Sequence, residues 1–572
     1  MSAEEIKKNS NSLRGTIAEA LASGGSHFSD IDERIIKFHG IYQQDLRDER
    51  IARMRAKEEP AYVLMVRTKI PGGNLSAEQY LALDHLTRTL GNGTLRITTR
   101  QDIQFHGILK ANLKKLIAGI NAARIITWGG CGDVERNVCA TPAPMNTPVH
   151  REVQRLALEI SNAFIPRSRA YFEIWLDGKK LSTEEFDEKD QLYGDAYLPR
   201  KFKTAIVIPP RNDVDIYTHD LGFVPHFPNG EIEGYTVLAG GGQGMDHAKE
   251  ATFPFLSQPL FYVRKEHVLT AARTIITMFR DFGDRTNRKH ARLKYVIADK
   301  GIEWFRNEAK ARLGAPTEDP KPLSFTTVAD ALGWNEQGDG KYYCGVKVEN
   351  GRIKDDGQVR FASAFRAIAE RFKCQIRLTN NENILFCNLA HDDRPKIDAI
   401  LKDYGIPGAE TYSAARSMSI SCVALPTCGL ALSESERVFP KLMDQIDVVL
   451  KELGLESEPI LFRMTGCPNG CARPYNTDFG FVGRGIGKYA MYVGGSHTGD
   501  RMSGLAFKSV AIEKIPAAVR GFLVEFVEKR KPSESFSAYW GRTQTNGPSP
   551  HSSQFHVELA ERAKRLAAKA AM

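Results

Sequence analysis

Four of the nine cysteines stand as two close pairs, which constrains the fold because paired thiols act together only when their loops meet. Five residues separate Cys422 from Cys428, and the turn-forming residues Pro-Asn-Gly separate Cys467 from Cys471. Thiolates are ligands of iron–sulfur clusters and of structural zinc. Because neither spacing is the Cys-x2-Cys of zinc ribbons, the pattern favours a cluster. Structural zinc and unrelated buried or redox-active cysteines stay open as alternatives.

The composition is that of an ordinary globular protein, with 42% hydrophobic and 26% charged residues among 572. The length predicts about three or four domains. No apolar run reaches the roughly 18 residues that cross a bilayer, and residues 1–8 lack the apolar core of a signal peptide. With an odd number of cysteines, this predicts a cytoplasmic protein without a membrane partner. The net charge of +9 favours an anionic ligand, an acidic protein or nucleic acid as partner.

An internal repeat relates residues 95–105 to residues 376–386 without a gap. Arginine, threonine, isoleucine and phenylalanine match at the same offsets, and both copies lie in a strand–helix–strand context. The repeat predicts a duplicated α+β unit with pseudo-two-fold symmetry. Because the second copy has Asn381 in place of Arg100 and Cys387 in place of the first copy's histidine, one half is expected to bind a ligand and the other to be structural.

Basic side chains gather on predicted strands. We predict one strand over residues 95–107, in which alternation places Arg96, Thr98 and Arg100 on one face. A second strand over residues 198–210 places two lysines on one face, with a solvated strand end as the alternative. The glycine-rich residues 240–244 lack dinucleotide-binding spacing, and we expect a loop whose backbone amides approach an anion.

Four motifs occur together in the chain. They are Thr465-Gly-Cys467-Pro-Asn-Gly-Cys471-Ala-Arg-Pro, Cys422-x5-Cys428, Arg96-x-Thr98-x-Arg100-Gln101-x-x-Gln104-x-His106-Gly107 and Pro199-Arg-Lys-Phe-Lys203. In this combination the chain resembles the siroheme-dependent sulfite reductases, most closely the hemoprotein (beta) subunit of the assimilatory enzymes. The resemblance that the motifs carry runs from about residue 11 to about residue 540. The resemblance implies an α+β fold with pseudo-two-fold duplicated ferredoxin-like half-domains plus two siroheme- and cluster-binding α/β domains.

The resemblance also implies five segments. They are an N-terminal arm (1–60), a first ferredoxin-like half-domain (61–128), a siroheme-binding reductase domain (129–325), a second ferredoxin-like half-domain (326–410) and a 4Fe-4S and siroheme-binding domain (411–572). Within the last segment we expect residues 554–572 to form a basic helix that is a solvated tail.

Two cofactors, siroheme and a 4Fe-4S cluster, are implied with their residues. The implied cluster ligands are Cys422, Cys428, Cys467 and Cys471, the last also bridging to the siroheme iron. The implied siroheme-binding residues are Arg96, Thr98, Arg100, Gln104, His106, Asn137 and Arg200, which suits a macrocycle ringed with carboxylates. The implied catalytic residues are Arg67 and Arg136, which bind sulfite, and Lys201 and Lys203, which deliver protons because a crowded ammonium releases a proton more readily than a guanidinium. The other five cysteines, Cys131, Cys139, Cys344, Cys374 and Cys387, are expected to be structural.

The implied activity is the six-electron reduction of sulfite to sulfide in assimilatory sulfur metabolism and cysteine biosynthesis. No P-loop, dinucleotide motif or flavodoxin-like segment is present, so electrons are expected from another protein. A flavoprotein reductase subunit that uses NADPH is favoured over ferredoxin. One alternative is a ferredoxin-dependent nitrite reductase that makes ammonia. The other is a non-enzymatic iron–sulfur protein that binds nucleic acid, but no nucleic-acid partner is expected because no recognised reading motif supports one.

Overall fold

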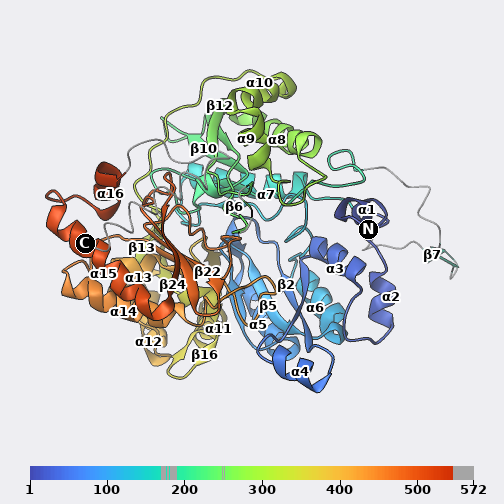
Figure 1. Cartoon of the computed structure of the whole chain (residues 1–572), viewed down its shortest axis with the longest axis horizontal. Helices are drawn as coiled ribbons and strands as arrows, with labels where there is room; N and C mark the ends of the chain where they lie inside the picture. Colours follow the sequence, from blue (N-terminus) through green and yellow to red (C-terminus); the bar gives the residue numbers. More distant parts are fainter. Residues whose placement is uncertain (169–174, 177–178, 181–189, 248, 250, 545–572) are drawn as a thin grey trace.

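The computed structural model describes residues 1–168, 175–176, 179–180, 190–247, 249 and 251–544. The helix predicted over residues 554–572 lies outside this part of the chain. Among the described residues, no helix is both long enough and apolar enough to span a bilayer. Figure 1 shows the first half of the duplication in blue, a central sheet in green above it, and the C-terminal elements in orange and red on the opposite side.

Two five-stranded sheets of matching design confirm the predicted duplication. The first has the spatial order β1 (Ile41–Asp45), β2 (Tyr62–Arg67), β5 (Ile103–Ile108), β4 (Leu95–Ile97) and β15 (Arg352–Ile353). The second has the order β13 (Gly333–Glu336), β14 (Tyr342–Val346), β19 (Ile384–Leu389), β18 (Gln375–Leu378) and β3 (Asn74–Leu75). Each half therefore supplies the last strand of the other half's sheet: β3 pairs with β18, and β15 pairs with β4.

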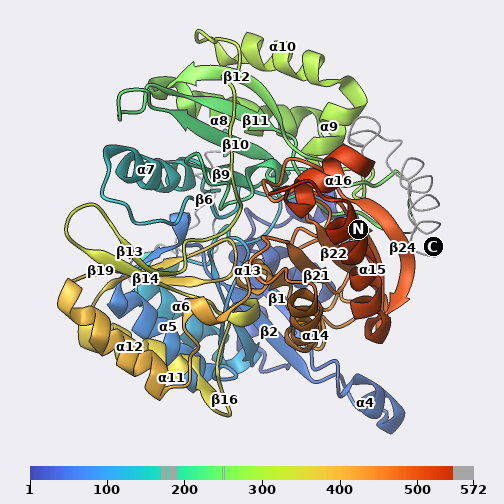
Figure 2. The same ribbon diagram turned by 90° about the vertical axis from the view of Figure 1, so that its left-hand side faces the viewer.

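Four helices from the two halves pack on these sheets and share one hydrophobic core (Figure 2). They are α5 (Ala77–Leu90), α6 (Lys110–Ala122), α11 (Phe361–Phe372) and α12 (Arg394–Asp403). Ser76 caps α5: its hydroxyl accepts a hydrogen bond from the amide of Gln79, and its own amide donates one to the side-chain oxygen of Gln79. Tyr80 and Leu83 of α5 lie fully buried in the same cluster as Phe365 of α11. The two halves therefore form a single packing unit.

A third sheet and its helices lie above the duplicated pair in Figure 2. Its order is β12 (Gln258–Arg264), β11 (Gly234–Ala239), β10 (Leu221–His226), β9 (Thr204–Ile206) and β6 (Cys139–Ala140). Its helices are α7 (Pro148–Ala163), α8 (Val268–Phe282), α9 (Leu293–Lys300) and α10 (Ile302–Leu313). Strand β9 is parallel to both neighbours, β10 and the edge strand β6, and the two predicted lysines lie in the segment just before it.

The fourth sheet carries the cysteine pairs. Its order is β20 (Ile420–Ser421), β21 (Phe462–Thr465), β22 (Phe479–Gly485), β23 (Lys488–Val493) and β24 (Gly504–Ala511). Its helices are α13 (Ala414–Met418), α14 (Phe439–Glu452), α15 (Ile515–Lys529) and α16 (Phe536–Gln544). The remaining elements are α1 (Ala3–Lys8), α2 (Ile17–Ala22), α3 (Asp30–Ile36), α4 (Arg50–Ala56) and the short pairs β7–β8 (Trp175–Leu176, Lys179–Lys180) and β16–β17 (Asp355–Asp356, Val359–Arg360).

The structure corrects two local predictions. Of the strand predicted over residues 198–210, only β9 (Thr204–Ile206) forms, so both predicted lysines precede the strand. The second correction concerns the β4–β5 segment. Residues 95–107 do not form a single strand: β4 ends at Ile97, the chain turns, and β5 begins at Ile103. The turn closes through the amide of Thr98, which donates to the carbonyl of Asp102, and Gln101 adopts a positive φ of 57°. The turn has no glycine or proline, which is why its polar alternation resembled a strand. Thr98 and Arg100 therefore belong to a turn, and only Arg96 belongs to the strand.

Candidate functional site: a cysteine centre beside a basic pocket

The two cysteine pairs meet because they follow neighbouring parallel strands. Cys422 directly follows β20, and Cys467 comes two residues after β21. These strands pair in parallel, so both loops leave the same edge of the sheet. The amide of Cys422 donates to the carbonyl of Met464 at 3.1 Å, which fixes the first loop against the end of β21. The fold thus brings together the two pairs that the sequence separates by 38 residues.

The sulfur environment suits a cluster. The amide of Gly466 donates to Sγ of Cys422 at 3.3 Å, and the side-chain amide of Asn469 donates to Sγ of Cys467 at 3.6 Å. Burial and then the proximity of Cys471 and Cys467 raise the pKa of Cys422, so the thiols share one space. No group of three or more His, Cys, Asp or Glu residues in the described ranges is arranged to hold a single metal ion. A cluster differs, because each thiolate binds its own iron.

The glycine-rich loop 240–244 lies behind the second cysteine pair. The amide of Met245 donates to the carbonyl of Pro468 at 3.0 Å, and Gln243 accepts from the amide of Tyr475 at 3.3 Å. Lys294 holds the loop from the other side, donating to the carbonyls of Gly242 and Gly244. The contacts of this loop therefore support the Cys467–Cys471 turn, while the approach of its amides to an anion stays a prediction.

The β4–β5 turn points a buried and unsatisfied guanidinium toward the interior. Arg100 is 8% exposed, and its Nε and Nη1 have no hydrogen-bond partner. Its Nη2 donates to the carbonyl of Asn137, whose side-chain amide donates to the carbonyls of Ile70 and Arg100. Leaving such donors unpaired in a protein interior is unfavourable. The turn therefore offers two donors that an anionic group of a ligand would satisfy.

Other residues of the predicted siroheme set contact protein groups. Arg96 donates to carboxylate oxygens of Glu382 and Glu436 at 2.7 and 3.0 Å. The hydroxyl of Thr98 accepts from the amides of Arg100 and Asp102, both at 3.2 Å, and so stabilises the turn. In this structure, therefore, carboxylates of the protein itself already neutralise Arg96, whereas Arg100 lacks such a partner.

Two further predicted residues, Gln104 and His106, lie on β5. With its amide in the flipped orientation, the oxygen of Gln104 accepts from Nε of Arg67 at 3.1 Å. Nδ1 of His106 lies 2.9 Å from Nη1 of Arg352. Burial, and then the guanidinium groups of Arg352 and Arg96, hold the pKa of His106 well below its usual value. The imidazole is therefore neutral and accepts the hydrogen bond from Arg352.

Three of the predicted substrate residues, Arg136, Lys201 and Lys203, lie close enough together for their charges to interact. Arg136 donates from Nε and Nη2 to the carbonyl of Gly132 at 3.1 and 3.0 Å, so this guanidinium is fixed in place. Phe202 is fully buried, and the alternation of the chain leaves Lys201 and Lys203 half-buried on its other side. Burial and then nearby Arg292 and Lys203 hold the pKa of Lys201 well below its usual value. Burial and the neighbouring cations therefore disfavour the charged form of Lys201.

The cysteine centre adjoins these residues. Burial, then Arg100 and Arg292, lower the pKa of Lys203 to about 7, while Asp220 and Cys471 act in the opposite direction. Cys471 is thus within electrostatic reach of Lys203, and its carbonyl accepts from the hydroxyl of Thr99 at 3.1 Å. The cations Lys203 and Arg100 therefore lie near the exposed Cys471. The cysteines fit an iron–sulfur cluster, and the cations fit an anionic macrocycle.

Several contributing residues were not predicted from the sequence. Arg292 is 7% exposed, binds Asp220 at 2.8 Å, and depresses the pKa values of both lysines. Asp133 lies 3.8 Å from Nη1 of Arg200 and accepts from Arg288 at 2.8 Å. No motif surrounds these residues. A buried charge pair between distant segments leaves no local pattern, so no sequence signal would have identified them.

A buried carboxylate joins three parts of the chain behind the cysteines. Oδ2 of Asp215 accepts from Nη1 of Arg463 and from Nε of Arg473, each at 2.7 Å. Arg473 also donates to the carbonyl of Asn380 and to Oδ1 of Asn381 in the second half of the duplication. Arg473 lies two residues after Cys471, so this network fixes the second cysteine loop against both the third sheet and the duplicated pair.

The N-terminal segment reaches the cysteine centre. Nη1 of Arg47, just after β1, donates to the carbonyls of Cys428 and Ala431 at 3.0 and 3.3 Å. Strand β1 itself pairs with β2 over five residues and extends the first sheet. Residues 41–47, which the sequence placed in an arm, therefore connect that sheet to the first cysteine loop.

The fold, the converging cysteine loops and the basic residues beside them fit a redox protein with an iron–sulfur centre and an anionic ligand. Sequence comparisons support this class. The profile of the nitrite and sulphite reductase 4Fe-4S domain matches residues 159–317, and that of the nitrite/sulfite reductase ferredoxin-like half domain matches residues 55–123 and 335–404. The chain belongs to the nitrite and sulfite reductase family, in the group of sulfite reductase hemoprotein components.

Full-length relatives support that assignment. A protein of Staphylococcus saprophyticus named sulfite reductase [NADPH] hemoprotein beta-component is 42% identical over 94% of this chain and 94% of its own length. One of the same name from Methylobacterium radiotolerans is 43% identical over 96% and 90%. The solved structure of the NirA protein of Mycobacterium tuberculosis has a TM-score of 0.77 at 23% identity, covering 94% of this chain and 96% of that one, which supports the fold.

Proposed function

We propose that this chain is the hemoprotein component of a sulfite reductase and reduces sulfite to sulfide with six electrons. The balanced reaction takes up eight protons, converts the three oxygens of sulfite to water and releases hydrogen sulfide. The observation that carries the proposal is the position of Lys203 beside both Arg100 and Cys471, where an anion and an electron source are each within reach. The name printed for both relatives, and the match of this chain to 94% and 90% of their lengths, support the same reaction.

The protein residues bind and protonate the substrate. Arg67 and Arg136 keep their charge at any physiological pH and hold the oxyanion. Lys201 and Lys203 have lowered pKa values because burial and neighbouring guanidinium groups disfavour their charged forms, so each ammonium releases a proton readily. When bound, the siroheme and the 4Fe-4S cluster supply the electrons for breaking the S–O bonds. Cys422, Cys428, Cys467 and Cys471 would hold the cluster.

The siroheme carboxylates would be bound by the basic turn. Nε and Nη1 of Arg100 lack partners, and each charge-assisted hydrogen bond they form to a carboxylate contributes about 1.5–3 kcal/mol. Arg200 is the next candidate, because burial lowers its pKa to about 10, and Asp133 neutralises it only from 3.8 Å. Arg96 is different, since Glu382 and Glu436 already bind it. We propose that Arg96 orients those carboxylates and the β4 edge.

The electron donor in this proposal is a flavoprotein reductase subunit that takes electrons from NADPH, as the relatives' printed name indicates for those proteins. The net charge of +9 favours docking to an acidic partner such as that subunit or a ferredoxin. A cytoplasmic location fits the nine cysteines, which are all free thiols in the structure. The pathway assignment to sulfur assimilation and cysteine biosynthesis is part of the same proposal.

The test begins with the purified holoprotein. We expect iron and labile sulfide together with the absorption of a tetrapyrrole; zinc in a colourless protein would refute the cofactor set. Competition between sulfite and nitrite then decides the substrate: kcat/KM should be higher for sulfite, and a clear preference for nitrite would transfer the chain to the nitrite reductases. NADPH should support turnover only when a flavoprotein is added, and the rate of that turnover should fall as the salt concentration rises. Turnover with NADPH and this chain alone would contradict the donor assignment.

A further inference from the structure

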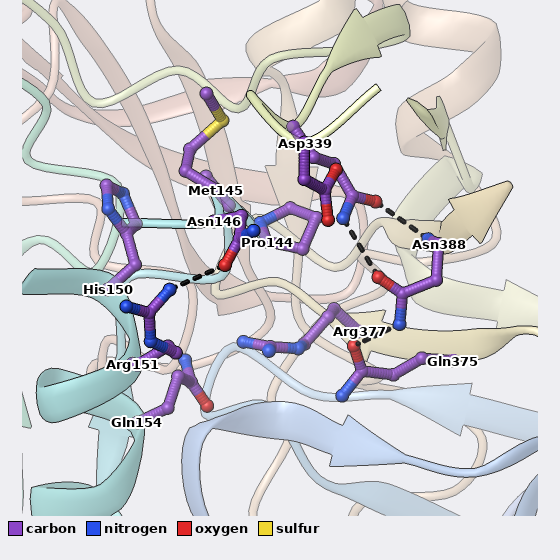
Figure 3. A pocket seen from close by; sticks show the side chains of 12 residues that line it. Pro144, Met145, Asn146, His150, Arg151, Gln154, Asp339, Gln375, Arg377 and Asn388 are labelled. Carbon is purple, nitrogen blue, oxygen red and sulfur yellow. Dashed lines mark hydrogen bonds between the residues drawn. The ribbon is translucent and has the colours of Figure 1, made fainter. Parts of the chain in front are cut away.

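A separate polar cavity of about 270 Å³ lies between the third sheet's helix α7 and the second half of the duplication (Figure 3). It is bounded on one side by the loop before α7 and the first turns of that helix, and on the other by β18 and β19. None of its lining residues belongs to the proposed sulfite or cluster site. Its principal polar residues are Asn146, His150, Arg151, Gln154, Gln375 and Arg377.

Arg377 is the unusual member of this cavity. Its side chain is 8% exposed, points into the cavity in Figure 3, and has no hydrogen-bond partner for Nε or Nη1. A guanidinium is charged at all physiological pH values. A buried charge without a partner is strongly unfavourable, and native proteins normally pair it. The cavity therefore contains an unmatched positive charge together with space for a ligand beside it.

The duplication shows that this charge is not a packing requirement of the fold. Arg377 pairs with Leu385 across β18–β19, and Arg96 pairs with Gln104 across β4–β5. The two arginines therefore occupy equivalent positions in the two copies. At the first position the protein provides two carboxylates, one from Glu382 and one from Glu436. At the second position the described residues supply no ion pair. The same structural position thus has an internal counterion in one half and an open cavity in the other.

The neighbouring groups favour an anion as the missing partner. Arg151 is exposed and donates to Oδ1 of Asn146 at 2.5 Å, leaving guanidinium donors on its other edge. Burial, then Arg377, lower the pKa of His150 to about 4, so His150 is neutral. Asp339 is the one carboxylate among the residues that line the cavity, and it is exposed. Two guanidinium groups therefore face one solvated carboxylate, and the cavity has a net positive charge.

The side-chain amides of three glutamines that line the cavity already donate hydrogen bonds to protein groups. Gln375 donates to Asn74 at 2.7 Å, Gln154 donates to the carbonyl of Thr141 at 2.9 Å, and Gln337 donates to Asn388 at 2.9 Å. These hydrogen bonds fix the walls before any ligand enters. Because the volume is below the roughly 300–1,000 Å³ of pockets for drug-sized ligands, the site is suited to a compact ligand and excludes a macrocycle.

We propose that this cavity is a binding site for a compact oxyanion, a phosphate or carboxylate group on a small molecule, held by Arg377 and Arg151. The planar guanidinium of Arg377 matches two oxygens of such a group. The bound anion connects α7 to β18, which itself pairs with β3 from the first half. Occupancy therefore stabilises the joint between the third sheet and the duplicated pair. This inference does not depend on which anion the catalytic pocket reduces.

Binding to the holoprotein tests the proposal. Inorganic phosphate and succinate, each titrated calorimetrically, distinguish a phosphate from a carboxylate ligand. We expect wild-type protein to bind at least one of them at one more site per chain than Arg377→Met does. Arg151→Met, at an exposed position, should weaken the same site by several fold, and Arg377→Lys should retain part of the affinity. Arg371→Met on α11, outside the cavity, is the matched control and should bind as wild type does.

The readout separates the two anion sites, because the catalytic pocket stays intact in every variant. Arg377→Met should keep its siroheme absorption and its sulfite turnover while losing the additional anion site. Because methionine removes an unpaired buried charge, we also expect this variant to be at least as stable as wild type without ligand. Equal stoichiometry and affinity in wild type, Arg377→Met and Arg151→Met, for both anions, would show that the cavity holds only water and would overturn the proposal.

Discussion

Replacing Asp215 with asparagine is expected to weaken the attachment of the second cysteine loop. The carboxylate is fully buried, and its Oδ2 accepts hydrogen bonds from Arg463 and Arg473 at 2.7 Å each. Its Oδ1 accepts from the side-chain amide of Asn476 at 2.9 Å. The variant loses the charge of two charge-assisted bonds and leaves two guanidinium groups without their counterion. Breaking a buried ion pair in this way costs about 3–5 kcal/mol.

The assay is the rate of unfolding in guanidinium chloride, followed by tryptophan fluorescence. If the network is already broken in the transition state, a loss of about 3 kcal/mol speeds unfolding about 100-fold, since each 1.4 kcal/mol is tenfold. Asp48→Asn is the matched control, because Asp48 is 61% exposed and its pair with Arg437 contributes about 0–1 kcal/mol. An Asp215→Asn protein that unfolds no faster than Asp48→Asn would refute the reasoning.

Three further outcomes follow from the site. Cys471→Ser should lower both the cluster and the siroheme content, measured by iron assay and absorbance. Cys344→Ser, at a buried cysteine of the second half, should retain both cofactors. Intact cofactors in Cys471→Ser would contradict the bridging role of Cys471. Lys203→Met should reduce kcat about 10²–10⁴-fold. Lys203 holds its proton below pH 7 and loses it above. The kcat/KM of the wild type should therefore fall as the pH rises through about 7, whereas the kcat/KM of Lys203→Arg should not. Superimposable pH profiles of the two proteins would exclude Lys203 as the titrating group. Arg47→Ala removes the hydrogen bonds to the carbonyls of Cys428 and Ala431, so a chelator should extract iron several-fold faster, and an unchanged rate would contradict that contact.

The parts of the site that the sequence predicted are those with local signatures. The cysteine pairs and the repeat around Arg96 and Arg377 each depend on residues close together in the chain. The cysteine loops converge because β20 and β21 are parallel neighbours, which the sequence did not state. The predicted roles of the individual site residues stay predictions, but the structure brings Arg100, Asn137, Lys203 and Cys471 into one region.

The parts that the sequence did not predict depend on contacts between distant segments. Arg292 and Asp220 form a buried pair across 72 positions, and Arg96 pairs with Glu382 across 286. Neither pair belongs to a periodic pattern or a motif in the sequence. The β4–β5 turn was missed for a different reason, because Gln101 adopts a left-handed conformation that glycine or asparagine would normally indicate. Packing in the rest of the protein determines that local choice.

The exchange of β3 and β15 between the two sheets has a consequence for synthesis on the ribosome. Strand β4 emerges early, but its partner β15 lies far downstream, beyond the whole third sheet. At about 5–20 residues per second, translation of the intervening chain takes on the order of tens of seconds. During that interval the edge of β4 presents unpaired backbone groups, which are a template for association with other chains. A pause in translation between residues 97 and 352 should therefore increase aggregation of the nascent protein.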